Sequence, residues 1–331
     1  MNSKKASTEG NVDVGANAAA GKESEAELEA WWQDFLTKKK LEDALDEDAK
    51  TAWETCAQRK MKFIREVRLL TDLYEPIGKQ VQTILSADHD HRGERLYREW
   101  CKIRRKECLL AYYDNQIFRA IYANYRFLSS ATSFIQALTE RIIPEHPDVE
   151  VYLRDHVRRV ISVGVGPGAD IAAFVAFART HGFTNRLVYY AIDQSDGWST
   201  FLNAFDRRWS MVHSVSVWFK SWRFGKRDDV ACLPDADMMV FSFSNTTLMD
   251  KAIWPLLQER YRFILVLDGM KDMVVTNFGY AGFSDFRLSE KTTVYYHFAG
   301  LPPGTTPTET PPSPPPSSDA SADTTKEKIG L

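Results

Sequence analysis

Apolar residues in the first half of the chain recur with the period of a helix. The clearest case is a stripe with the spacing i, i+3, i+4, i+7 and i+8, formed by Leu28, Trp31, Trp32, Phe35 and Leu36. This spacing places the five side chains on one helix face. The same period continues through later segments, RKMKFIREVRLLTDLY and ECLLAYYDNQIFRAIYANYRFL. The pattern predicts an all-α region of four or five helices.

The pattern changes after Pro144 and Pro147, which mark a boundary. Beyond Val151, short β-rich runs alternate with helical ones. The predicted strands are VRRVISVGV, RLVYYAID, SVSVWFKSW, ADMMVFSFS and RFILVLDG, and the predicted helices are ADIAAFVAFARTHG, WSTFLNAFDRRWSMV and TTLMDKAIWPLLQERY. Two alternating segments, FSDFRLSE and KTTVYYHFA, then form a hairpin. This order predicts an α/β fold, with a mostly parallel sheet covered by helices on both faces and a C-terminal antiparallel hairpin.

Four segments follow from these patterns and from composition. Residues 1–26 are small and polar, and we expect them to be disordered. Residues 27–146 form the predicted helical N-terminal domain, and residues 147–300 form the Rossmann-like α/β domain. Residues 301–331 are rich in Pro, Ser and Thr and cannot build a core. The run PPSPPP could dock a proline-recognising protein, and the helical domain could also bind a partner, although a solvated tail is the simpler interpretation.

Composition indicates a soluble protein of the cytoplasm or nucleus. Of the 331 residues, 44% are hydrophobic and 26% are charged, and the formal net charge of −3 gives no global attraction to nucleic acid or membrane. The four cysteines show neither a CxxC pair nor zinc-ligand spacing, so we expect reduced thiols. The sequence contains no signal-peptide core and no apolar run long enough to span a bilayer.

The segment ISVGVGPGAD, residues 161–170, is the strongest candidate for chemistry. Gly164 can take the positive φ that a sharp strand-to-helix turn requires. Gly166 lets the backbone approach a ligand, and Gly168 lets the new helix pack closely on the strand. Asp170 lies in the first helical turn, where its charge suits the helix dipole. The alternative is that these glycines only shape a tight turn.

Acidic residues after the next two strands could complete a nucleotide site. Asp193 ends the second strand, at the sheet edge where a ribose diol would lie, although an aspartate there could also be a simple turn former. After the third strand, Asp228 and Asp229 could recognise an adenine amino group or could be surface-turn residues. Gly164, Gly166 and Ala169 also match the dinucleotide pattern G-x-G-x-x-G/A, so NAD is a second possible cofactor.

The segment VISVGVGPGADIAAFVAF resembles the first motif of class I S-adenosylmethionine-dependent methyltransferases, with Ser162 where that family often has an acid. VYYAIDQSDGW resembles the second motif, ADMMVFSFSN the fourth strand, and the terminal hairpin the sixth and seventh strands. The resemblance spans about residues 151 to 300. It implies a seven-stranded sheet and S-adenosylmethionine as cofactor, held by Gly164, Gly166, Gly168, Asp170, Asp193, Asp228, Asp229, Ser244 and Asn245.

The chain departs from the family pattern after the fourth strand. SFSN stands where many base N-methyltransferases have Asn/Asp-Pro-Pro-Tyr, and neither a nucleophilic cysteine nor a metal-binding acid cluster is evident. We therefore assign no catalytic residue and no metal. Methyl transfer is a displacement at a sulfonium, so positioning can supply most of the catalysis. A catalytically degenerate scaffold of the same fold remains an alternative. An NAD-dependent oxidoreductase would need a Tyr-x-x-x-Lys or His–Asp pair, and we identify none.

Two basic stretches make RNA slightly favoured over protein or a small molecule as the methyl acceptor. Residues 92–106 carry seven Arg or Lys against two Glu, and residues 207–227 interleave basic residues with aromatic ones. Basic and aromatic residues together can bind phosphates and stack on bases. The simpler interpretations are a solvated helix face for the first stretch and core positions for Trp209, Trp218 and Phe219 in the second.

Overall fold

A computed structural model describes residues 47–103, 110–204, 213–244, 249–268, 282–290 and 292–303. The predicted stripe between Leu28 and Leu36 lies outside these ranges. So do residues 1–26 and nearly all of the predicted tail. The described residues up to Leu301 form one compact unit, and a second begins at Pro302.

The helical region that the apolar period predicts is present. It consists of α3 (Glu47–Ser86), α4 (Arg92–Ile103), α5 (Leu110–Tyr113), α6 (Gln116–Gln136), the π-helical η1 (Ala137–Ile142), α7 (Ile143–Glu145) and α8 (Pro147–Asp155). Among the α3 residues whose burial is described, the buried apolar side chains are Leu70, Leu73, Ile77 and Val81. Their spacing is that of one helix face, so packing against the rest of the unit explains the pattern. The helix runs on through Pro76.

The apolar period continues through residues 107–128 without an evident break, but α5 and α6 are separate helices. Asn115 ends the run because its side-chain oxygen accepts the backbone N–H groups of Ile117 and Phe118, at 3.0 and 3.2 Å. Asparagine is a preferred N-cap, and this contact satisfies donors that the first helical turn leaves unpaired. The chain therefore turns between α5 and α6.

The sheet has seven strands, as predicted. They are β1 (Arg159–Val163), β2 (Leu187–Asp193), β3 (Val215–Ser221), β4 (Met238–Ser242), β5 (Phe263–Asp268), β6 (Ser284–Ser289) and β7 (Thr292–Phe298). Their order is β3-β2-β1-β4-β5-β7-β6. The strands from β1 to β5 are parallel, whereas β7 is antiparallel to both β5 and β6. The mostly parallel sheet and the closing hairpin are both confirmed.

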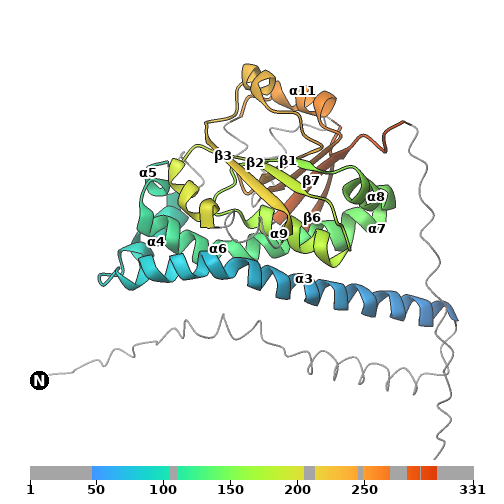
Figure 1. Cartoon of the computed structure of the whole chain (residues 1–331), viewed down its shortest axis with the longest axis horizontal. Coiled ribbons are helices and arrows are strands. Elements are labelled where there is room, and N and C mark those ends of the chain that lie inside the picture. Colours follow the sequence, from blue (N-terminus) through green and yellow to red (C-terminus); the bar gives the residue numbers. More distant parts are fainter. Residues whose placement is uncertain are drawn as a thin grey trace, which may run out of the picture. The chain divides into compact units, whose positions relative to one another are not determined.

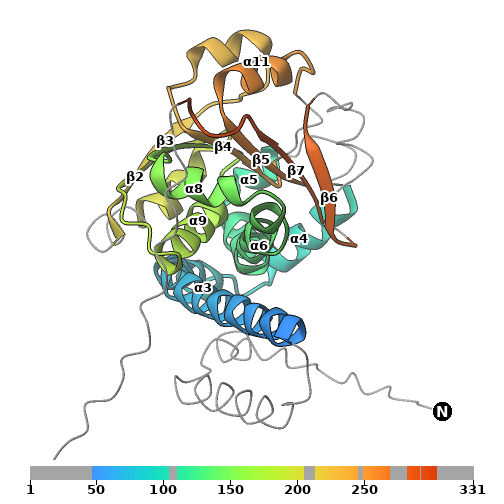
Figure 2. The same ribbon diagram turned by 90° about the vertical axis from the view of Figure 1, so that its right-hand side faces the viewer.

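Helices cover both faces of the sheet. On one side lie α9 (Ala169–Thr180), α6 and α3, and on the other lies α11 (Ile253–Arg260) (Figure 1, and from the side in Figure 2). Each face has its own apolar cluster. All ten residues from Ala169 to Ala178 are buried. A helix that is apolar all round belongs inside a protein, and α9 is accordingly enclosed by the sheet and the N-terminal helices.

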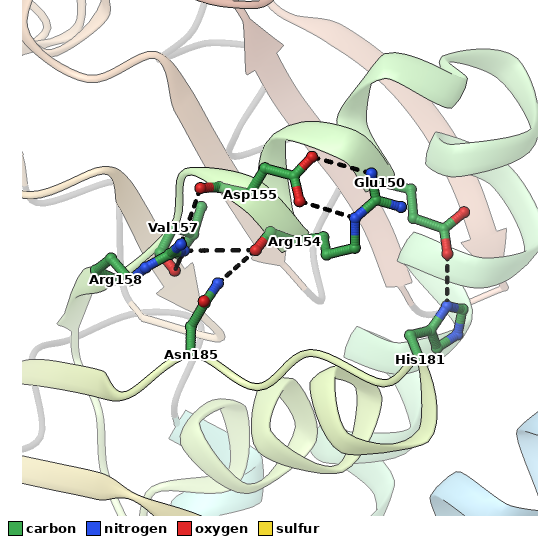
Figure 3. A network of polar contacts seen from close by, with 7 residues as sticks. All are labelled: Glu150, Arg154, Asp155, Val157, Arg158, His181 and Asn185. Carbon is green, nitrogen blue, oxygen red and sulfur yellow. Dashed lines mark hydrogen bonds and ion pairs between the residues drawn. The ribbon is translucent and has the colours of Figure 1, made fainter. Parts of the chain in front are cut away.

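A buried histidine joins three helices on this side. His181, which follows α9, has one ring nitrogen 2.8 Å from Glu150 of α8 and the other 3.1 Å from Glu66 of α3. Figure 3 shows the Glu150 contact and the neighbouring network, in which the Arg154 carbonyl accepts hydrogen bonds from Asn185 and Arg158. These contacts connect α8, the end of α9 and the turn before β2.

The order of strands reverses at β1, and this reversal positions the site. β1 pairs with β2 on one side and with β4 on the other. The connections that leave the carboxyl ends of β1 and β4 therefore diverge and open a crevice. In open α/β sheets, such a switch point is where ligands bind.

Candidate cofactor site

The glycine loop lies at this switch point. Gly164, Gly166 and Gly168 have φ values of 68°, 52° and 84°, a region that side chains disfavour. The backbone N–H groups of Gly164 and Val165 both donate to the carbonyl of Ile192, at 2.8 and 3.2 Å. The loop is thus fixed to the end of β2, and α9 begins directly after Gly168.

The first two glycines serve different purposes. A Cβ on Gly164 would lie 2.4 Å from the Cβ of Ser244, so the residue is small because the chain after β4 passes against it. A Cβ on Gly166 would have only the Gly164 carbonyl oxygen near it, at 4.0 Å. The sequence predicted a turn role for Gly164 and an open approach at Gly166. The positive φ of Gly164 and the space over Gly166 agree with this.

Substituting the two glycines by alanine should separate these roles. Gly164→Ala should lower the free energy of unfolding by about 2 kcal/mol, because backbone strain and a clash with Ser244 combine. Gly166→Ala should cost about 1 kcal/mol, from its positive φ alone. Urea denaturation of both variants measures the difference. Equal losses would show that Ser244 moves aside and that Gly164 is not limited by close packing.

Asp193 ends β2 and faces the loop. One carboxylate oxygen accepts the N–H of Gly166 and the other accepts the N–H of Ser195, both at 3.0 Å. Burial raises the pKa of Asp193 to about 6. Its two oxygens keep further lone pairs, so the carboxylate could still accept a diol. The predicted acid and the predicted glycine are therefore in direct contact.

Asp170 is buried rather than exposed at the helix start. Only 2% of its surface is accessible, and Oδ2 accepts a hydrogen bond from the hydroxyl of Ser162. Its other oxygen, Oδ1, has no hydrogen-bond partner among the described residues. Burial raises the pKa of Asp170 to about 6. A carboxylate from α9 thus reaches the strand position where the methyltransferase motif often carries its acid.

A pocket opens beside these groups, between the glycine loop, the end of β4 and α6. The residues that line it are Tyr122, Arg126, Phe127, Ser130, Gly164, Val165, Gly166, Pro167, Ala169, Asp170, Ser242 and Phe243. The α6 residues were missed by the sequence analysis. Tyr122, Arg126 and Ser130 are four residues apart and therefore share one face of α6. The sequence signal that could have revealed them is Arg126, a cation within the apolar stripe of α6.

The N-terminal helices also anchor the loop after β2. The hydroxyl of Ser195 donates to the carbonyl of Tyr113 at 3.0 Å, and Arg119 donates to the same carbonyl at 2.6 Å. A Cβ on Gly197 would lie 2.1 Å from the Arg119 guanidinium carbon. The side chain of Arg119 therefore packs directly over this glycine. The helical region and the sheet build the site together.

The segment after β4 carries backbone strain. Phe243 has a φ of 52°, which is unusual for a bulky residue. The hydroxyl oxygen of Ser244 is buried, with no hydrogen-bond partner in the described part of the chain. Ser244 contacts the glycine loop as described above, whereas Asn245 lies outside the described residues. Strained residues of this kind concentrate at functional sites.

The two acids after β3 lie in the 3₁₀ helix η3 (Arg227–Cys232). Asp229 accepts the backbone N–H groups of Gly225 and Lys226, at 2.9 and 2.7 Å, and so stabilises its own turn. Asp228 is exposed. The contacts of these two residues do not include the glycine loop, and their recognition of adenine stays a prediction.

The two basic stretches differ in their surroundings. In α4 the basic residues Arg92, Arg95, Arg98 and Lys102 are exposed, as a solvated helix face requires. In the second stretch, the core position considered for Trp218 is wrong, because 66% of its surface is exposed. Strand alternation explains this, since Phe219 turns to the opposite face and packs against the core. Trp209 lies outside the described residues.

The described residues contain neither a metal-ligand cluster nor a membrane-spanning helix. There, His, Cys, Asp and Glu side chains form no group of three that could hold a metal ion. No helix in the same ranges combines the length and apolarity needed to cross a membrane.

No protein-family model and no curated protein matches the sequence. Among solved structures, the N-terminal domain of human METTL16 in complex with SAH is 11% identical, with a TM-score of 0.33, over 47% of this chain and 68% of that one. The hMettl16 catalytic domain in complex with the MAT2A 3'UTR hairpin 6 is 12% identical, with a TM-score of 0.32, over 52% and 82%. The C-terminal domain of precorrin-6Y C5,15-methyltransferase from Rhodobacter capsulatus is 9% identical, with a TM-score of 0.29, over 45% and 84%.

The assignment of the fold rests on the strand order and the position of the glycine loop. The parallel strands β3-β2-β1-β4-β5 continue into the antiparallel β7 and β6, and the loop that follows β1 lies at the switch point. The chain therefore has a class I methyltransferase-like fold.

Proposed function

We propose that this protein binds S-adenosylmethionine at the switch point and transfers its methyl group to an acceptor. The observation that carries the proposal is the orphaned Oδ1 of Asp170, a buried carboxylate oxygen of a residue that lines the pocket. A buried carboxylate oxygen without a partner is costly, and a cationic ligand would remove that cost. The amino-acid part of S-adenosylmethionine carries an ammonium group of the required charge.

The surrounding residues match the other parts of the same ligand. Arg126 lines the pocket with Asp170 and supplies a cation for the carboxylate of the amino-acid part. Asp193, which contacts Gly166, supplies acceptors for the ribose diol. The open space over Gly166 lets the middle of the ligand cross the loop between Asp170 and Asp193. The ligand would thus extend from α6 to the end of β2.

The buried acid Asp170 disfavours NAD. In dinucleotide enzymes, the glycine loop and the helix N-terminus bind a pyrophosphate. Here a buried carboxylate, Asp170, occupies the first turn of that helix. A phosphate beside it would meet a like charge in surroundings of low polarity. The site therefore suits a ligand with a cationic end.

The acceptor would approach from the end of β4, where Ser242 and Phe243 border the pocket. When bound, the cofactor supplies an electrophilic methyl group on a sulfonium. The residues of this chain hold it in place, keep water away and orient the acceptor, so proximity provides most of the rate enhancement. We favour RNA as the acceptor, from the basic and aromatic residues of β3 and the segment after it.

Calorimetric titration with S-adenosylmethionine, S-adenosylhomocysteine and NAD tests the proposal. We expect micromolar binding of the first two and no binding of NAD. If none of the three binds, the protein is a scaffold that has kept the fold without the cofactor. Binding of NAD alone would overturn the assignment of the loop.

Affinity for S-adenosylhomocysteine should depend on pH. Asp170 and Asp193 both have pKa values of about 6, so both lose their charge as the pH falls through that value. The anionic forms bind the ligand, and affinity should therefore drop by about 10-fold or more from about pH 7.5 to about pH 5. Adenosine, which has no ammonium group, should show a smaller drop because it meets only Asp193. Equal affinities for S-adenosylhomocysteine at the two pH values would contradict the roles of both acids.

A further inference from the structure

The outer part of the sheet has a face that is largely open. On β3, Val215, Val217 and Phe219 pack into the cluster with α9. The residues between them, Ser216, Trp218 and Lys220, must therefore point to the opposite face. There Trp218 keeps 66% of its surface accessible, the largest value among the exposed large apolar side chains of the described residues.

Aromatic and basic side chains lie on the same part of the sheet as Trp218. Its partner in the register with β2 is Tyr190, which packs against the cluster on that face together with Trp222. The ammonium of Lys220 lies 4.5 Å from the centre of the Trp222 ring. Arg186 donates to the hydroxyl of Ser216 at 3.2 Å, which places its charge beside the same strand. We call Tyr190, Trp218, Trp222, Arg186 and Lys220 the β3 platform.

The charge of this region is positive although the whole chain is slightly negative. Residues 186–192 and 213–223 contain no acid, whereas they carry Arg186, Lys220 and Arg223. A polyanion would therefore be attracted to the platform, although the formal net charge of the protein is −3. An apolar protein surface would gain less here, because the strongly exposed apolar group is a single ring, and Lys220 and Ser216, which Arg186 contacts, lie on the same face of β3.

The platform leads directly to the candidate cofactor site. The backbone N–H of Trp222 donates to the carbonyl of Asp193 at 2.8 Å. The hydroxyl of Ser221 donates to the carbonyl of Gln194 at 3.5 Å. An extended polyanion bound along the platform would reach the edge of the sheet where Asp193 lies.

We infer that the β3 platform binds single-stranded RNA, with a base stacked on Trp218 and phosphates paired with Arg186 and Lys220. Stacking on an aromatic ring combined with cationic contacts to the backbone is how single strands are held without sequence preference. The choice of RNA rests on the proposed function. The binding itself requires no methyl transfer.

Fluorescence anisotropy with a labelled uridine oligonucleotide tests the inference without cofactor present. Trp218→Ala should weaken binding by about 10-fold, and Trp218→Phe should retain most of it because a ring remains. Replacing Lys220 with glutamine should reduce the salt dependence of binding, since one phosphate contact is lost. A matched DNA oligonucleotide shows whether the ribose hydroxyls contribute.

Tyr125→Ala is the matched control. Among the described residues, Tyr125 is the other exposed large aromatic residue, 44% accessible, and its hydroxyl contacts Glu94 of α4, the helix with the basic face. Its loss should leave RNA binding unchanged. If Tyr125→Ala weakens binding and Trp218→Ala does not, RNA binds at α4 and the inference is wrong.

Titration of the same proteins with S-adenosylhomocysteine separates this inference from the proposed function. If the wild-type protein binds S-adenosylhomocysteine but no RNA, the inference is overturned and the proposed binding of the cofactor stands. A protein that binds RNA through Trp218 without binding the cofactor would support the platform and count against the methyltransferase. If RNA does not bind, and a protein binds the wild type but not Trp218→Ala, the partner of the platform is a protein and the inference is wrong.

Discussion

Asp193→Ala is expected to weaken the binding of S-adenosylhomocysteine by about 10- to 100-fold. The variant loses charged hydrogen bonds to the ribose, which are worth about 1.5–3 kcal/mol together. It also frees the N–H groups of Gly166 and Ser195, which the carboxylate accepts in this structure. The dissociation constant from calorimetry measures the effect.

Two further variants separate binding from loop structure. Asp193→Asn keeps one acceptor oxygen and should have an intermediate affinity. Asp196→Ala removes an exposed acid from the same loop and should bind the ligand normally. If folded Asp193→Ala binds S-adenosylhomocysteine as tightly as the wild type, Asp193 is not part of the site.

His181→Ala is expected to lower the free energy of unfolding by about 3–5 kcal/mol, as the loss of one partner in a buried ionic cluster does. The side chain of His181 is 6% exposed and that of Glu66 is not exposed at all. Without the histidine, Glu66 would be a buried acid without its partner. The double variant His181→Ala/Glu66→Gln should therefore be more stable than His181→Ala. His89→Ala, in the exposed turn between α3 and α4, should change little.

The cost of His181→Ala should depend on pH. Burial by itself lowers the pKa of His181, but the hydrogen bonds with Glu150 and Glu66 outweigh it and the pKa is raised. The stabilisation that charged His181 provides is thus complete below the pKa of histidine in the unfolded chain, about 6.5. It is lost as the pH rises through the raised pKa of the folded state. The hydrogen bond from His181 lowers the pKa of Glu150. The stabilisation that ionised Glu150 provides is therefore lost as the pH falls through this lowered pKa.

Urea unfolding at several pH values measures this dependence. The difference between wild type and His181→Ala should be largest from about pH 5 to about pH 6.5 and should shrink in alkaline solution. A difference that stays constant into alkaline solution would show that His181 acts through packing and not through its charge.

Local patterns in the sequence were enough to predict the strands and the loop. Most of the parallel strands are short apolar runs, β3 alternates between its two faces, and the glycine triplet marks a sharp turn with three positive φ values. The order of the strands was not predicted, because pairing between β1 and β4 joins residues far apart in the sequence. Local periodicity contains no information on such pairings.

The parts of the site that the sequence did not reveal depend on tertiary packing. Arg126, on α6, comes well before the glycine loop in the sequence, and only the fold brings it to the same pocket as Asp170. The clash that requires glycine at position 164 comes from Ser244, on a different strand connection. Asp170 was predicted from the helix dipole, whereas its buried contact with Ser162 requires the helix to pack on β1.

A crystal structure of the protein with S-adenosylhomocysteine tests the central claim most directly. We predict that the ribose hydroxyls contact Asp193 and that the ammonium group lies within hydrogen-bonding distance of Asp170 Oδ1. Ligand bound elsewhere, or an amino-acid part that points away from Asp170, would contradict the proposed site.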